Sequence, residues 1–91
     1  MKINEIVRDV MENTTNEESK KIKQSEVIAR LKDRFGLAVS AAAFSDRLKN
    51  ENMTMNTALE ILDVLGYEIV VQPKTGSRKS YNVERGKVGR K

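Results

Sequence analysis

The chain has 91 residues and a formal net charge of +4, and it contains neither cysteine nor histidine. Disulfides and thiolate metal sites are therefore excluded. Because histidine is the commonest general base and metal ligand, we also expect no enzyme activity, no metal site and no cofactor. No apolar run approaches the length of a membrane span, and no signal-peptide core follows the N-terminus, so we expect a cytoplasmic protein that does not bind membranes.

The first predicted element is an amphipathic helix over residues 2–13. Five apolar residues share one helical face at the spacing i, i+3, i+4, i+7 and i+8: Ile3, Ile6, Val7, Val10 and Met11. The next segment, NTTNEESKK, has no apolar residue and is predicted to be a solvated loop. The alternative is an early start of the next helix, at a capping box formed by Thr15 and Glu18.

A second helix is predicted over residues 24–35, and Gly36 suits its left-handed C-terminal position. The apolar face of this helix consists of Val27, Ile28, Leu31 and Phe35. Ser40 is then expected to cap a third, short helix, because its hydroxyl can accept a hydrogen bond from a free amide of the first turn. In this helix Phe44 and Leu48, four residues apart, are predicted to face the core.

The outward face of the third helix carries only small or polar groups. Once Phe44 and Leu48 face inward, the helical period turns a second set of residues outward. This set consists of Ala42, Ser45, Asp46 and Lys49, with Ala41 at its edge and Arg47 on its flank. Such a face allows a helix to approach another surface closely, either a second helix of the same fold or an external partner.

A fourth helix is predicted to begin after its cap, Thr54, and to end before Gly66. Its expected core stripe consists of Met55, Ala58, Leu59, Leu62 and Leu65. The β-branched segment from Tyr67 to Val71 is predicted to be a strand. This strand ends at Pro73, because proline cannot donate a hydrogen bond to a neighbouring strand.

Most of the positive charge belongs to the tail. Residues 74–91 carry seven basic residues and one acidic residue, a net charge of +6, whereas residues 1–73 carry a net charge of −2. With three glycines and few apolar groups, the tail is expected to be flexible. We therefore divide the chain into a folded domain over residues 1–73 and a basic tail over residues 74–91. The tail either keeps the protein in solution or attracts nucleic-acid phosphates.

Three segments, taken in order, resemble the helix-turn-helix domains of Cro-type and lambda-repressor-type regulators, the xenobiotic-response-element family. They are KQSEVIARL, VSAAAFSDRLKNENM and TMNTALEILDVLGYEI, which resemble the first helix of the motif, its recognition helix and the closing helix. The resemblance implies an all-α, four-helix helix-turn-helix domain, here with one C-terminal strand and a flexible basic tail. The interval from Glu26 to Ser40 is longer than is usual in the family, and Ala41 and Ala42 stand where a glutamine is common.

A recognition helix lies in the major groove, where an alanine methyl can pack on a thymine methyl and a hydroxyl or carboxylate can contact base edges. The side chains expected to face the bases are Ala41, Ala42, Ser45 and Asp46. Basic side chains and the free amides of a helix N-terminus suit phosphates. The residues expected to contact phosphates are Gln24, Ser25, Ser40, Arg47, Lys49, Arg78 and Lys79.

A homodimer is expected, because the apolar strand has no obvious partner and an exposed strand edge favours association. Its predicted interface consists of Ile61, Val64, Tyr67, Ile69 and Val71, paired about a two-fold axis with the same residues of a second copy. The alternative is an internal hairpin, in which the tail segment KSYNV folds back onto the strand.

Taken together, these features predict a sequence-specific double-stranded DNA-binding regulator, of the kind found in phages and mobile elements. We expect a repressor that binds a palindromic operator as a homodimer. The alternative is a helix-turn-helix-fold protein-interaction module, an inhibitor, antitoxin or adaptor, that does not depend on DNA.

Overall fold

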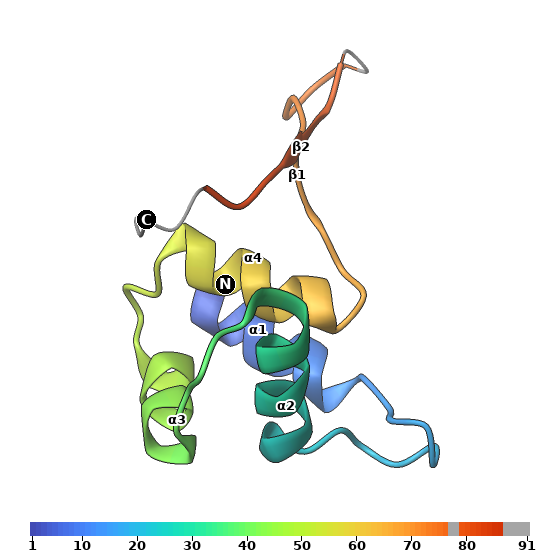
Figure 1. Cartoon of the computed structure of the whole chain (residues 1–91). Helices are drawn as coiled ribbons and strands as arrows, with labels where there is room; N and C mark the ends of the chain where they lie inside the picture. The colour runs from blue at the N-terminus through green and yellow to red at the C-terminus, as the bar shows by residue number, and fades with distance from the viewer. Residues whose placement is uncertain (77–78, 87–91) are drawn as a thin grey trace.

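The computed structural model describes residues 1–76 and 79–86, which form a small, mostly helical domain with a two-stranded sheet. The elements are α1 (Ile3–Glu12), α2 (Gln24–Phe35), α3 (Ala41–Lys49), α4 (Met55–Val64), β1 (Ile69–Val71) and β2 (Tyr81–Val83). Figure 1 shows the four helices packed into one body, from which the ribbon of β1 and β2 stands out. The four predicted helices are therefore confirmed, with bounds close to those expected.

One core is shared by the four helices. Its buried apolar side chains are Val7, Met11, Ile22, Val27, Leu31, Phe44, Leu48, Met53, Ala58, Ile61, Leu62 and Leu65. The predicted stripes contribute most of these residues, and two members of the stripes are exposed. Met55, which was expected in the core stripe of α4, is 52 % exposed, because it lies in the first turn before the helix reaches the core. Ile6 of α1 is likewise exposed, at the edge of its stripe.

The predicted helix ends are confirmed by their local hydrogen bonds. The Oγ of Ser40 accepts from the backbone N–H of Ala43 at 3.1 Å. The Oγ1 of Thr54 accepts from the N–H of Thr57 at 3.1 Å. Gly36 has the left-handed conformation expected at the end of α2, with a φ of 69°.

The segment between α1 and α2 is a loop, as predicted, and the alternative early helix start does not form. The side-chain oxygen of Asn16 organises this loop by accepting from the backbone N–H groups of Glu18 and Lys20, at 2.9 and 3.1 Å. Ser19 has a φ of 64°, the only non-glycine residue with a positive φ in the described part of the chain. The loop thus satisfies its backbone locally rather than against the core.

The prediction that the C-terminal strand lacks an internal partner is wrong. Strand β1 pairs antiparallel with β2, in the register Ile69–Val83, Val70–Asn82 and Val71–Tyr81. The internal hairpin, which the sequence suggested as the alternative, is therefore the structure that forms. The expected single strand becomes two strands, and residues 81–83 of the predicted flexible tail belong to the sheet.

The segment after β2 is tied to the helical body. The Nε of Arg85 donates to Oε2 of Glu60 on α4 at 2.8 Å, and both side chains are largely buried. The guanidinium of Arg85 also lies 4.6 Å from the centre of the Phe35 ring, a distance typical of a cation–π contact. The backbone N–H of Gly86 donates to Oδ1 of Asn56 at 2.8 Å. These contacts supply the buried Glu60 with a positive partner that sequence patterns did not indicate.

The expected surplus of apolar surface on α4 is also corrected. Ile61, predicted to lie in a dimer interface, is 1 % exposed and belongs to the core of the single chain. Val64 is half-buried and packs against the same core. Of the exposed apolar residues that follow α4, Val70, Val71 and Tyr81 lie on the ribbon, whereas Tyr67 lies between α4 and β1.

Candidate nucleic-acid interface

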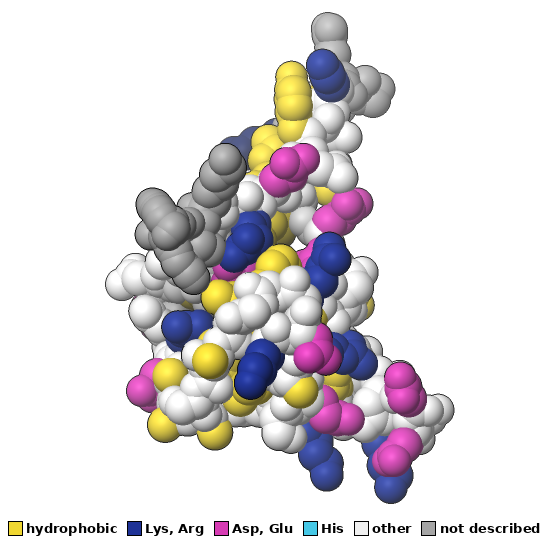
Figure 2. All heavy atoms as spheres, in the orientation of Figure 1, with side chains coloured by type: hydrophobic (Ala, Val, Ile, Leu, Met, Phe, Trp, Pro, Cys, Tyr) yellow, Lys and Arg dark blue, Asp and Glu magenta, His cyan; other side chains and the backbone are white. Residues whose placement is uncertain are grey.

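The outer face of α3 is as the helical period predicts. Phe44 and Leu48 are buried, whereas Ala41, Ala42 and Asp46 are exposed. Ser45 is half-buried at the margin of this face. Figure 2 shows small hydrophobic side chains at the surface over α3, at the lower left of the molecule. The structure therefore brings together the four side chains predicted to face the bases.

The position of α3 is set by three kinds of contact. Phe44 and Leu48 anchor its inner face in the core, and Ser40 caps its start. At its other end, Nδ2 of Asn4 on α1 donates to the backbone carbonyl of Leu48 at 3.0 Å. Asn4 is 1 % exposed, and its Oδ1 has no hydrogen-bond partner within the described residues. The apolar pattern of the sequence did not indicate this role for Asn4, although Asn4 lies three residues before Val7 on the apolar face of α1.

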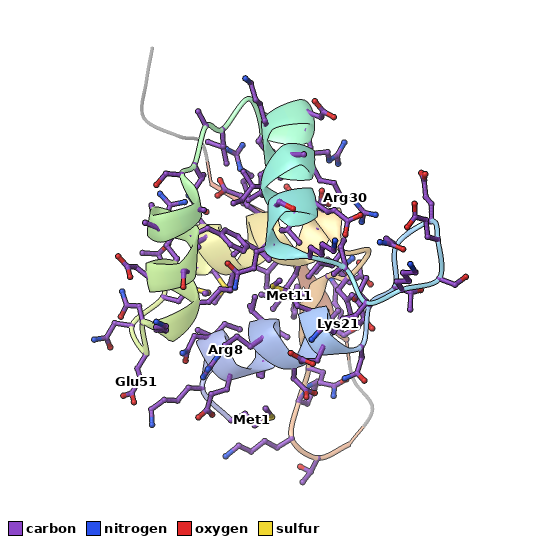
Figure 3. All side chains as sticks on the ribbon, turned by 90° about the horizontal axis from the view of Figure 1, so that it is seen from below. Met1, Arg8, Met11, Lys21, Arg30 and Glu51 are labelled. Carbon is purple, nitrogen blue, oxygen red and sulfur yellow. The ribbon has the colours of Figure 1, made fainter. Side chains whose placement is uncertain are left out.

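Helices α2 and α3 pack against each other and are joined by residues 36–40. In the view of Figure 1 the two helices run in the same direction, from bottom to top. In Figure 3, which shows the molecule from below, they run in opposite directions. The two helices therefore cross at an angle. The N-terminus of α2 and the whole of α3 lie at the end of the molecule opposite the ribbon. One surface can therefore present both elements to the same partner.

The residues predicted to contact phosphates do not all lie on this surface. Arg47 and Lys49 flank the outer face of α3, and both are exposed. Within residues 1–76 and 79–86, neither they nor Asp46 takes part in an ion pair. Lys79 lies on the ribbon, at the other end of the molecule (Figure 1), with its Nζ 5.4 Å from the centre of the Tyr81 ring. Arg78 lies outside the described residues.

The start of α2 is less free for an anion than its sequence suggested. Gln24 and Ser25 are exposed there, as expected. However, Oε1 of Glu26 already accepts from the backbone N–H of Lys23 at 2.8 Å. The Nδ2 of Asn16 donates to both carboxylate oxygens, at 3.0 and 3.2 Å. A phosphate at this helix end would approach a carboxylate that already caps the helix.

These contacts lower the pKa of Glu26 below its ordinary value of 4.5, chiefly because the N–H of Lys23 donates to the carboxylate and, more weakly, because Asn16 does. A lowered pKa means that the charged carboxylate stabilises the folded state. This contribution is complete above pH 4.5 and is lost as the pH falls through the lowered pKa.

We therefore expect the Glu26→Gln variant to be less stable than the wild type at neutral pH. In acid, where Glu26 is protonated, the two proteins should be equally stable. The physical reason is that glutamine keeps the size of the side chain but lacks the charged carboxylate that accepts hydrogen bonds from Lys23 and Asn16. Unfolding measured at several pH values checks the difference, and the carboxyl chemical shift of Glu26 followed by NMR checks its pKa. Titration of Glu26 at or above 4.5 would contradict this account.

A hollow lies between the ribbon and the helices, with a volume of about 440 Å³. Most of the charged side chains that line it are engaged: Nε of Arg34 donates to Oδ2 of Asp63 at 2.8 Å, Arg85 pairs with Glu60, and Oε1 of Glu68 accepts from Nδ2 of Asn82. In the part of the chain that the structure describes, no three His, Cys, Asp or Glu side chains come close enough to hold a metal ion. This hollow therefore offers paired charges and aromatic edges rather than a set of reactive groups.

No protein-family model, curated protein or solved structure matches this chain. The likeness of three segments to helix-turn-helix regulators therefore stands beside the geometry of α3 as the basis for a functional proposal. Among the described residues, no helix combines the length and the apolar character needed to cross a lipid bilayer.

Proposed function

We propose that this protein is a double-stranded DNA-binding transcriptional regulator whose α3 enters the major groove. The observation that carries the proposal is the outer face of α3, where Ala41, Ala42 and Asp46 are exposed together with the two cations Arg47 and Lys49. The crossing of α2 and α3, and the three segments that resemble helix-turn-helix regulators, support the same function. In this arrangement α2 and the segment of residues 36–40 are the first two parts of the motif.

Small side chains on α3 allow its backbone to approach the floor of the groove. Alanine methyl groups then pack on thymine methyl groups, and Asp46 accepts from a cytosine amino group or repels other bases. Arg47 and Lys49, at the flank of the same helix, contact phosphates and fix the position of α3 without selecting sequence. The core contacts of Phe44 and Leu48 and the bond from Asn4 to Leu48 hold α3 in place for this contact.

The proposed regulator works by occupying its operator, through contacts made by α3. A homodimer would contact two half-sites about one helical turn apart, on a palindromic sequence. Repression of a phage or mobile-element promoter is the simplest outcome of such occupancy.

Selection of bound duplexes from a random pool tests this function, because it reports binding and specificity together. We expect enrichment of a palindromic site, with an affinity that falls steeply with salt concentration. In Lys49→Gln the slope of log affinity against log salt should decrease by about 0.9, the value for one lost phosphate contact. Lys20→Gln is the matched control, because Lys20 lies in the loop on the far side of α2 from α3 (Figure 1) and should leave the slope unchanged. No enrichment of any duplex would refute the proposal.

A protein-interaction module independent of DNA is the second candidate, and one observation favours it. The ribbon exposes apolar side chains that a protein partner would cover, including Val71 and Tyr81. Capture of one partner protein that is unaffected by nuclease treatment, together with the absence of duplex binding, would favour this candidate over the first.

A further inference from the structure

The end of the ribbon that lies farthest from the helices is basic. From Ile69 to Val83 the sequence contains three basic residues and no acidic residue. Two of these cations, Lys74 and Lys79, lie in the connection between β1 and β2, and both are exposed. Neither forms an ion pair with another described residue. We call this connection, residues 72–80, the ribbon tip. It carries positive charge that the described residues do not neutralise.

The acidic residues of the ribbon lie at its base. Oε1 of Glu68, just before β1, accepts from Nδ2 of Asn82 at 2.9 Å. Six residues separate Glu68 from Lys74, a span of up to about 20 Å in an extended chain. Figure 2 shows the same order, with acidic side chains closer to the helices than the basic side chain at the end of the ribbon. An anionic partner at the tip would therefore meet cations before it approached a carboxylate.

The shape of the ribbon suits a groove of duplex DNA. Its two strands lie about 5 Å apart, and the major groove, about 12 Å wide, admits a two-stranded ribbon. Figure 1 shows that the outer part of the ribbon stands clear of the helices. Next to the tip, Val71 and Tyr81 are 55 % and 57 % exposed, and apolar side chains can contact thymine methyl groups inside the groove. The exposed apolar pair and the cations beside it therefore suit the same partner.

We propose that the ribbon tip enters the major groove of a second DNA segment, distinct from the segment bound by α3. Lys74 and Lys79 contact phosphates along the edges of this groove. Because α3 lies at the opposite end of the molecule (Figure 1), the body of the protein separates a straight duplex on α3 from the tip. One chain thus holds two DNA segments together. The first segment rests on the proposed function of α3, whereas the ribbon contact does not depend on it.

The lysines of the tip have a second possible role that needs no partner. Charged side chains on a ribbon prevent its edges from pairing with strands of other chains. Lys79 also contacts the ring of Tyr81, with its Nζ 5.4 Å from the ring centre, but this contact leaves its charge uncompensated. The two roles differ in one measurable respect. Protection of the edges predicts no binding of a duplex by the ribbon.

The first test measures the ribbon by itself. Ala42→Glu is used as the background, because it weakens binding through α3, and the probe is a fluorescent duplex of random sequence. In a salt series, Lys74→Gln with Lys79→Gln should lower the slope of log affinity against log salt by about 1.8, the value for two lost phosphate contacts. Lys20→Gln with Lys32→Gln is the matched control, because these two lysines are equally exposed and lie outside the ribbon. An unchanged slope in the ribbon variant would overturn the proposal.

The second test measures bridging by the protein with an intact α3. A duplex selected by the wild type is immobilised, and a labelled duplex of random sequence is added with the protein. The wild type should capture the labelled duplex, whereas the variant with Lys74→Gln and Lys79→Gln should bind the immobilised duplex and capture none. Equal capture by this variant would overturn the proposal, because another surface, such as the α3 of a second copy, would then hold the labelled duplex. A wild type that binds the immobilised duplex without capturing the other would also overturn it.

Polyglutamate tests whether charge alone explains the contact, since it offers anions without a groove. At equal concentration of charge, it should displace the labelled duplex less well than an unlabelled duplex does, and equal displacement would overturn the assignment to DNA. Equal thermal midpoints of the variants exclude unfolding as the cause of any loss. The salt series uses no selected duplex. Ribbon-dependent binding without any selected site would therefore refute the proposed function alone, and a selected site without ribbon-dependent binding would refute this inference alone.

Discussion

Replacing Phe44 by alanine should lower the free energy of unfolding by about 3–5 kcal/mol, the usual cost of removing a buried aromatic side chain and leaving a cavity. Phe44 is 0 % exposed and is among the largest fully buried side chains of the described core. A chain of this size is expected to be stable by only about 5–14 kcal/mol. The substitution should therefore remove a large part of the stability, and with it any function of α3.

Urea unfolding followed by circular dichroism measures this loss. Asp46→Ala, on the exposed face of the same helix, is the matched control and should stay within about 0.5 kcal/mol of the wild type. A loss below about 1 kcal/mol for Phe44→Ala would mean that the core closes around the gap. The inner face of α3 would then not be the anchor described above.

Replacing Ala42 by glutamate should weaken specific DNA binding strongly while leaving the fold intact. The new side chain adds bulk and a negative charge at the point of closest approach to the groove. Specific affinity should fall by at least about 1–3 kcal/mol, which is the scale of one lost base contact. The thermal midpoint should change little, because Ala42 is exposed and glutamate retains most of the helix propensity of alanine.

Thr15→Glu is the control for charge, because it makes the same change of charge in the exposed loop before α2. Titration of a selected duplex should show a much larger loss for Ala42→Glu than for Thr15→Glu. Asp46→Ala completes the series: relaxed specificity would show that Asp46 selects bases, and a uniform gain would show that it only repels phosphates. Normal binding by Ala42→Glu would mean that α3 is not the recognition helix.

Several features of this protein follow from neighbouring residues alone. The caps at Ser40 and Thr54 and the turn at Gly36 are visible in the sequence, because each depends on hydrogen bonds or backbone angles within a few residues. The inner and outer faces of α3 are predictable for the same reason, since the helical period relates Phe44 to Ala42 without reference to the rest of the fold. The candidate interface on α3 could therefore be identified before its position was known.

Contacts between distant segments could not be identified in this way. The partner of β1 depended on whether the tail could return to it, and a composition poor in apolar residues suggested that it would not. The tertiary structure shows why it does: Val83 is partly covered at the base of the ribbon, and Arg85 reaches the buried Glu60 and the ring of Phe35. A buried carboxylate requires a positive partner, and this requirement appears only after packing has buried it.

The sequence by itself thus determined the four helices, their ends and the small, polar outer face of α3, because these depend on interactions within one or two helical turns. Only the tertiary structure decided that Ile61 is buried in the core, that Asn4 holds the end of α3 and that Lys79 lies at the opposite end of the molecule from α3. These outcomes depend on how elements pack. Residues far apart in the chain come into contact only when the shared core excludes water from all four helices together.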